Sequence, residues 1–144
     1  MIARVTAILG VLAAIGLPPA ALAQDTAPAA GLLLELNALQ PSETGCRVTF
    51  LATNGLGKPL DKAAFEVALF NPAGSIERLV TLDFKSLPTG KTKVLQFDLG
   101  KTPCDGLSRV LINDVAACTG TDVAAGECLA ALSTANKTAT QFGL

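Results

Sequence analysis

Apolar and polar residues alternate along most of the chain after residue 30, which is the pattern of β-strands with one buried face. Five stretches alternate in this way and predict strands; they cover residues 32–37, 46–53, 65–70, 76–84 and 93–99. A sixth stretch, 107–115, is apolar on both faces, as expected for a central strand of a sheet. The pattern therefore predicts a chain built mainly of β-strands.

The best-defined turn is the segment 71–74, Asn-Pro-Ala-Gly, between the third and fourth predicted strands. Proline presets φ for a type I turn, and glycine supplies the left-handed residue that closes a hairpin. We therefore expect a positive φ at Gly74, whereas Gly31, in the loop before the first predicted strand, needs no such conformation. In the strand after the turn, Arg78 interrupts a face that is expected to point into the core and carries Ile76, Val80, Leu82 and Phe84.

The C-terminal part has a different pattern. Residues 122–132 are rich in alanine and predict a short helix, and residues 137–142 predict a last strand. Short strands at regular spacing, joined by turns that contain proline and glycine, favour two packed antiparallel sheets. The predicted fold class is therefore all-β: an antiparallel immunoglobulin-like β-sandwich of about seven strands, with a short C-terminal helix.

The first 23 residues have the organisation of a secretory signal peptide. Arg4 is their only charge, an apolar run follows, and the segment ends in Ala21-Leu22-Ala23. Cleavage after Ala23 would leave 121 residues with a net charge of −2. Residues 24–30 are predicted to be a flexible leader and residues 31–144 a single β-sandwich domain. The predicted location is periplasmic or secreted.

The composition argues against several classes of function. The chain has no histidine, tryptophan or tyrosine. It therefore lacks the usual general base near neutral pH, the commonest transition-metal ligand and the aromatic side chains that most often stack on sugars and bases. The nearly balanced charge gives no electrostatic basis for binding nucleic acid, and no second apolar run is long enough to span a membrane. We predict no enzymatic activity, no cofactor, no nucleic-acid partner and no membrane span.

All four cysteines follow the predicted signal peptide: Cys46, Cys104, Cys118 and Cys128. An even number in a small exported domain, without any Cys-x-x-Cys pair, favours two disulfides over a metal or redox site. Three pairings are possible. In an immunoglobulin-like sandwich the second and sixth strands run in the same direction on opposite sheets, so Cys46 and Cys104 should lie at the same end, within disulfide reach. We therefore prefer Cys46–Cys104 with Cys118–Cys128, and these are the only site residues that the sequence assigns.

Three other groups of side chains have a chemical interpretation and a simpler structural one, which we prefer in each case. Asp105 before the sixth strand and Asn113-Asp114 after it could hold Ca²⁺ near one end of the sandwich, but isolated acidic residues at strand ends usually cap turns. Lysines near the fourth and fifth strands could meet an acidic partner, but lysine on an edge strand more often prevents edge-to-edge pairing; they are Lys85, Lys91, Lys93 and Lys101. The serines lie in no nucleophile motif; those considered are Ser75, Ser86, Ser108 and Ser133.

Three segments are similar to known sequences: GCRVTFLATN (45–54), LFNPAGSIERLVTLDF (69–84) and CDGLSRVLINDVAAC (104–118). They resemble a group of small exported bacterial proteins of unknown function, over most of the chain after the predicted signal peptide. The resemblance implies an exported, disulfide-bonded, β-rich domain and carries over no catalytic or binding residue.

Two main hypotheses about function follow from the sequence. The first is a non-enzymatic interaction module whose edge or loop end contacts an envelope protein or polymer. The second is a carrier of a small apolar ligand or lipid between the sheets, which a broad apolar cavity would favour and a close-packed core would not. A third, less favoured, is a histidine-free hydrolase, which would need two carboxylates that converge in a cleft.

Overall fold

The computed structural model describes residues 30–144, so the predicted signal peptide and all of the predicted leader except Ala30 lie outside the described residues. The described chain forms eight β-strands, a 3₁₀ turn (η1) and one short α-helix. Their order is β1 (Gly31–Pro41), β2 (Gly45–Gly55), β3 (Leu60–Phe70), β4 (Ile76–Leu87), β5 (Thr92–Gly100), η1 (Cys104–Gly106), β6 (Arg109–Thr119), α1 (Glu127–Ala130), β7 (Leu132–Asn136) and β8 (Gln141–Gly143).

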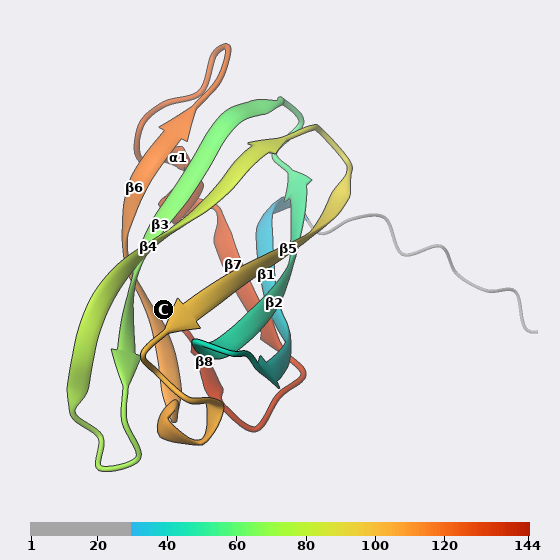
Figure 1. Ribbon diagram of the computed structural model, residues 1–144. Helices are drawn as coiled ribbons and strands as arrows, with labels where there is room; N and C mark the ends of the chain where they lie inside the picture. Colours follow the sequence, from blue (N-terminus) through green and yellow to red (C-terminus); the bar gives the residue numbers. More distant parts are fainter. Residues whose placement is uncertain (1–29) are drawn as a thin grey trace, which may run out of the picture.

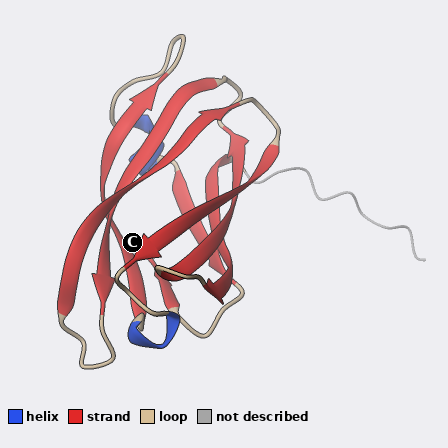
Figure 2. Ribbon diagram, in the orientation of Figure 1, coloured by secondary structure: helices blue, strands red, loops and turns tan. Residues whose placement is uncertain are grey.

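The strands form two four-stranded sheets, with the orders β5-β2-β1-β7 and β4-β3-β6-β8. In Figure 1, β4, β3 and β6 lie side by side on the left, and β2, β1 and β7 lie on the right. Neighbouring strands are antiparallel except β1 with β7 and β6 with β8, which are parallel. Figure 2 shows how little of the described chain is helical, and within residues 30–144 no helix is long and apolar enough to cross a membrane. The all-β fold class is confirmed.

Side chains from both sheets fill one apolar core. At its centre, the ring of Phe50 on β2 contacts Phe84 on β4, Phe97 on β5 and Phe142 on β8, with ring centroids 5.6, 6.0 and 5.3 Å apart. Edge-to-face pairs of this kind contribute about 0.5–1.5 kcal/mol each beyond the area they bury. All six phenylalanines lie in strands, as predicted, and five of them, all except Phe70, supply core volume in a chain without tryptophan or tyrosine.

The alternation of β4 differs from the prediction at its first residue. The inner face carries Val80, Leu82 and Phe84 as expected, but Ile76 is 58% exposed. The physical reason is a β-bulge: Ile76 pairs with Phe70 and Arg78 pairs with Leu69, so Glu77 is an extra residue that reverses the alternation. The prediction that Ile76 faces the core is therefore wrong.

Arg78, which interrupts the inner face of β4, connects the two sheets. Its guanidinium donates hydrogen bonds to the carbonyl oxygen of Gly100, at the end of β5, and to the hydroxyl of Thr102. Thr102 is itself buried. Because β4 and β5 are edge strands of different sheets, this side chain ties the two edges together at one end.

The C-terminal segment differs most from the prediction. The helix expected over 122–132 is restricted to Glu127–Ala130, because Asp122 has φ +60, which an α-helix does not tolerate, and because the residues after Ala131 form β7. The strand expected over 137–142 is the shorter β8, since the side chain of Asn136 bonds the backbone of the residues that follow and makes a turn. Residues 30–144 therefore form eight strands where about seven were predicted.

The four cysteines form two disulfides, Cys46–Cys104 and Cys118–Cys128. This is the pairing preferred from the strand order. The first bond joins β2 of one sheet to η1, just before β6 of the other, across 58 residues of sequence; the second joins β6 to α1 across 10 residues. The first disulfide therefore connects the two sheets, whereas the second holds the C-terminal connection to β6.

Of the four glycines with positive φ values within residues 30–144, two bear on the predictions, one as expected and one not. Gly74 has φ +82, as the Asn-Pro-Ala-Gly turn predicted. Gly31 has φ +112, and a Cβ at this position would lie 2.5 Å from the carbonyl oxygen of Ala131. The same oxygen accepts a hydrogen bond from the backbone N–H of Leu32 at 2.9 Å. The prediction that Gly31 needs no special conformation is therefore wrong, because the chain entering β7 passes directly against it.

Asn54 is a fully buried polar residue that organises the turn after β2. Its amide donates to the carbonyls of Lys58 and Leu87, and its side-chain oxygen accepts from the N–H of Leu56. We expect Asn54→Ala to lower the free energy of unfolding by about 2–3 kcal/mol, because buried backbone groups lose their partners. Denaturant unfolding measures this loss. The exposed amide of Asn113 is the control: Asn113→Ala should change stability by less than about 0.5 kcal/mol, and equal losses would contradict the assignment.

Candidate interaction surface

Apolar side chains from three strands gather on the outer face of the second sheet. On β3, Val67 and Leu69 belong to the core, so the alternate residues Ala68 and Phe70 lie on the opposite face. Ala68 pairs with one residue of β4 and one of β6, and so does Phe70. We define the outer patch as Ala68, Phe70, Ile76, Leu79 and Leu111.

The outer patch is exposed at its β4 side and closed at its centre. Ile76 and Leu79 are 58% and 52% exposed, and they are two of the five large apolar residues that are exposed within residues 30–144. Ala68 is only 2% exposed although it lies on an outer face, because it stands between its larger neighbours Leu79 and Leu111. Contiguous exposed apolar surface of this kind typically marks a site of interaction.

Opposite charges flank the outer patch along the strand direction. On one side, the guanidinium of Arg109 lies over the ring of Phe70, with its central carbon 5.4 Å from the ring centroid, a cation–π geometry. On the other side, Glu66 pairs with Asp114, and the amide of Asn113 donates to the Glu66 carboxylate at 2.7 Å. The surface is therefore positive at one end, apolar in the middle and negative at the other end.

The outer patch extends to a free sheet edge. β4 has 12 residues and is the outermost strand of its sheet, so one side of its backbone has no strand partner among residues 30–144. The two residues of the outer patch that belong to β4, Ile76 and Leu79, lie at this edge. Unpaired backbone groups beside an apolar surface can orient a partner that the apolar side chains hold.

The lysines near this edge bond to their own chain. Lys85 lies on β4 and Lys93 on β5, both of them edge strands, as the structural interpretation expected. The ammonium of Lys85 lies 2.9 Å from the carboxylate of Asp83, and that of Lys93 donates to the carbonyl of Ser86 at 2.7 Å. Lys91 precedes β5 and Lys101 follows it. The arrangement agrees with protection of the edges rather than with a basic binding surface.

The residues considered for calcium lie apart along the chain. Asp105 is in η1, before β6, whereas Asn113 and Asp114 lie in the middle of β6 opposite Glu66. Within the described part of the chain, no group of three or more acidic or cysteine side chains is placed to hold a metal ion. These three residues, although close in the sequence, therefore do not form a cluster in the structure.

Two of the serines bond to backbone carbonyls. The hydroxyl of Ser108 donates to the carbonyls of Phe70 and Asn71, and that of Ser133 donates to the carbonyl of Leu32. These bonds connect neighbouring segments of the sheets. They give the two serines a structural role.

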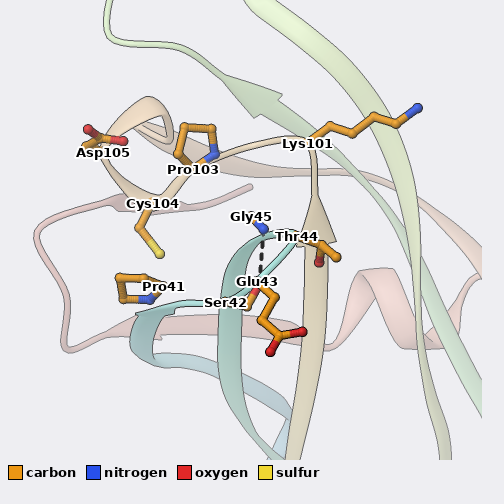
Figure 3. Close-up of a pocket in the computed structure, with 9 residues that line it drawn as sticks. All are labelled: Pro41, Ser42, Glu43, Thr44, Gly45, Lys101, Pro103, Cys104 and Asp105. Carbon is orange, nitrogen blue, oxygen red and sulfur yellow. Dashed lines mark hydrogen bonds between the residues drawn. The ribbon is translucent and has the colours of Figure 1, made fainter.

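A hollow of about 700 Å³ lies between the β1–β2 turn and the chain after β5 (Figure 3). Glu43, Lys101 and Asp105 line it, but in Figure 3 their charged groups point in different directions. The hydrogen bond drawn there runs from the N–H of Gly45 to the hydroxyl of Ser42, at 3.1 Å. The carboxylates of this hollow do not converge, so it lacks the arrangement that a histidine-free hydrolase requires.

Beside this hollow, hydroxyl groups stabilise the charged form of a carboxylate. Asp98 accepts hydrogen bonds from Thr44 at 2.7 Å and Ser42 at 3.0 Å. These hydrogen bonds and the nearby charge of Arg47 hold the pKa of Asp98 below its ordinary value of 3.8. The bond from Thr44 has the largest effect. The pKa of Asp98 is lower in the folded than in the unfolded protein, so these bonds stabilise the fold at pH values above the ordinary pKa. This stabilisation is lost as the pH falls through the lowered pKa of the folded protein.

We expect Thr44→Val to raise the pKa of Asp98 toward its ordinary value, because the largest stabilising bond to the carboxylate is lost. An NMR titration of the Asp98 carboxyl group measures the change. Thr53→Val is the control, since its hydroxyl bonds that of Thr92 instead. An Asp98 pKa that is the same in both variants would contradict the assignment.

A second hollow, of about 530 Å³, lies between the edge strands β4 and β5. Leu95 and Phe97 are among its lining residues, together with polar and charged side chains. The ring of Phe97 packs on that of Phe84, with centroids 5.1 Å apart, and Phe84 is fully buried in the core. The packed rings of Phe84 and Phe97 therefore separate this hollow from the space between the sheets. Such packing favours an interaction module over a carrier.

Comparisons with protein families, curated proteins and solved structures found no match to this chain. The outer patch is therefore assigned from its own geometry. The sequence interpretation did not identify it, because Ile76 was expected to face the core and because the patch combines residues from β3, β4 and β6.

Proposed function

We propose that this chain is an exported, non-enzymatic interaction module, built as an immunoglobulin-like sandwich, that binds another protein through the outer patch. The predicted signal peptide and the two disulfides support a periplasmic or secreted location, because disulfides persist in oxidising compartments. The observation that carries the proposal is the exposure of Ile76 and Leu79 beside the free edge of β4.

The chemistry of the outer patch fits a protein partner better than an envelope polysaccharide. Protein interfaces have apolar centres with polar and charged groups at the rim, and the outer patch has this arrangement. Sugars are most often held by stacked tryptophan and tyrosine, which the chain lacks. The partner we favour is therefore an envelope protein with a complementary apolar surface.

Capture of partners by matched variants tests this function. Leu79→Glu places a charge in the outer patch, and Val94→Glu places the same charge at a 65% exposed position on β5, in the other sheet. We expect Leu79→Glu to weaken binding by at least about tenfold, because a charge must then be desolvated at the interface. Val94→Glu should bind like the unmodified chain. The same proteins retained equally by both variants would contradict the proposal.

A further inference from the structure

The charges that flank the outer patch are placed evenly about its centre. The central row of the patch consists of Leu79, Ala68 and Leu111, which are paired across β4, β3 and β6. On β6, Arg109 lies two residues before Leu111, and Asp114 lies beyond Leu111 on the other side, opposite Glu66 across a bulge. Residues two apart on a strand are separated by roughly 6.6 Å, so one charge lies about one row from the centre in each direction.

Neither of these charges has an ionic partner within residues 30–144. The ion pairs of the described chain involve neither Arg109 nor Asp114. Asp114 accepts a hydrogen bond from the N–H of the next residue, Val115, at 2.7 Å. Arg109 and Asp114 pair with Phe70 and Glu66, which are four residues apart on β3, so roughly 13 Å of strand separates them and they form no ion pair with each other. Each remains available to an opposite charge on a partner.

We propose that the partner seated on the outer patch is a second copy of this chain, packed face to face about a two-fold axis along the central row. This inference rests on the proposed function, since it names the partner of the same surface. A half turn about that row places Arg109 of one copy over Asp114 of the partner subunit, and symmetry repeats the pair. The central rows of the two copies, each made of Leu79, Ala68 and Leu111, meet between the two ion pairs. The surface is self-complementary because its charge reverses across the axis.

Sedimentation velocity of the oxidised chain, from micromolar to near-millimolar concentration, tests the proposal. We expect a dimer whose population rises with concentration. Arg109→Asp and Asp114→Lys should each weaken it by at least about tenfold, because like charges then face each other. The double variant Arg109→Asp/Asp114→Lys should restore the dimer, since it exchanges the two charges. Leu79→Glu should be monomeric, and Val94→Glu should dimerise like the unmodified chain.

Two results would overturn the second copy as the partner. One is an unmodified chain that stays monomeric over the whole range, and the other is a double charge exchange that dimerises no better than the single reversals. Unfolding midpoints of all variants, measured in parallel, separate loss of the dimer from loss of the fold. Failure here is distinguishable from failure of the proposed function, because an outer patch that binds a different protein would still lose that protein in Leu79→Glu.

Discussion

Removal of the Cys46–Cys104 disulfide should lower the free energy of unfolding by about 4 kcal/mol, because the bond closes a long loop in the unfolded chain. The two cysteines are 58 residues apart, and Cys46 is fully buried where β2 of one sheet meets the chain that enters the other. The change is the double substitution Cys46→Ala/Cys104→Ala. Denaturant unfolding under conditions that keep the other disulfide oxidised measures the loss.

The Cys118–Cys128 disulfide is the matched comparison, since it closes a loop of only 10 residues. The same loop-closure argument gives about 2.7 kcal/mol for its removal. Cys118→Ala/Cys128→Ala should therefore be the more stable of the two double variants. The reverse order would show that the link between the sheets is not the dominant one.

Replacement of Gly31 by valine should destabilise the fold by about 3–4 kcal/mol, because two effects add. The positive φ of +112 disfavours any side chain. The new Cβ would also lie 2.5 Å from the carbonyl oxygen of Ala131, so either the start of β1 or the chain entering β7 must move. The midpoint of denaturant unfolding measures the effect.

Gly74→Val separates the two contributions. Gly74 has a similar requirement for positive φ, at +82, but no atom outside its two chain neighbours lies within 4 Å of a Cβ built there. We expect about 1–2 kcal/mol, from backbone strain alone. Equal midpoints for the two glycine variants would mean that the close approach of β7 to Gly31 has no energetic consequence.

The sequence predicted the strands that have a strong local signal. Alternation identified the buried faces of β1, β2, β3 and β5, and the Asn-Pro-Ala-Gly segment identified the turn at Gly74. The strand order also led to the cysteine pairing that the structure contains. What failed depends on contacts between distant segments. β7 has only five residues and pairs in parallel with β1, so its partner, and its effect on Gly31, lie about 100 residues away in the sequence.

The outer patch could not be found by the same reasoning. Its central row exists only through the pairing register of β4, β3 and β6, and register is not a local property of the sequence. Strict alternation places Ile76 on the inner face, and the bulge at Glu77 moves it outward. Leu79 is out of step with the inner residues of β4, and this was the available signal: a large apolar residue on an otherwise polar face.

Crosslinking from within the outer patch tests the central claim most directly. A photo-reactive phenylalanine analogue replaces either Leu79 or, as the control, Val94, which is somewhat more exposed and lies on the other sheet. In cells that produce and export the chain, irradiation should give a covalent protein adduct from position 79 and little or none from position 94. Adducts from position 94 with none from position 79 would contradict the assignment of the outer patch as the interaction surface.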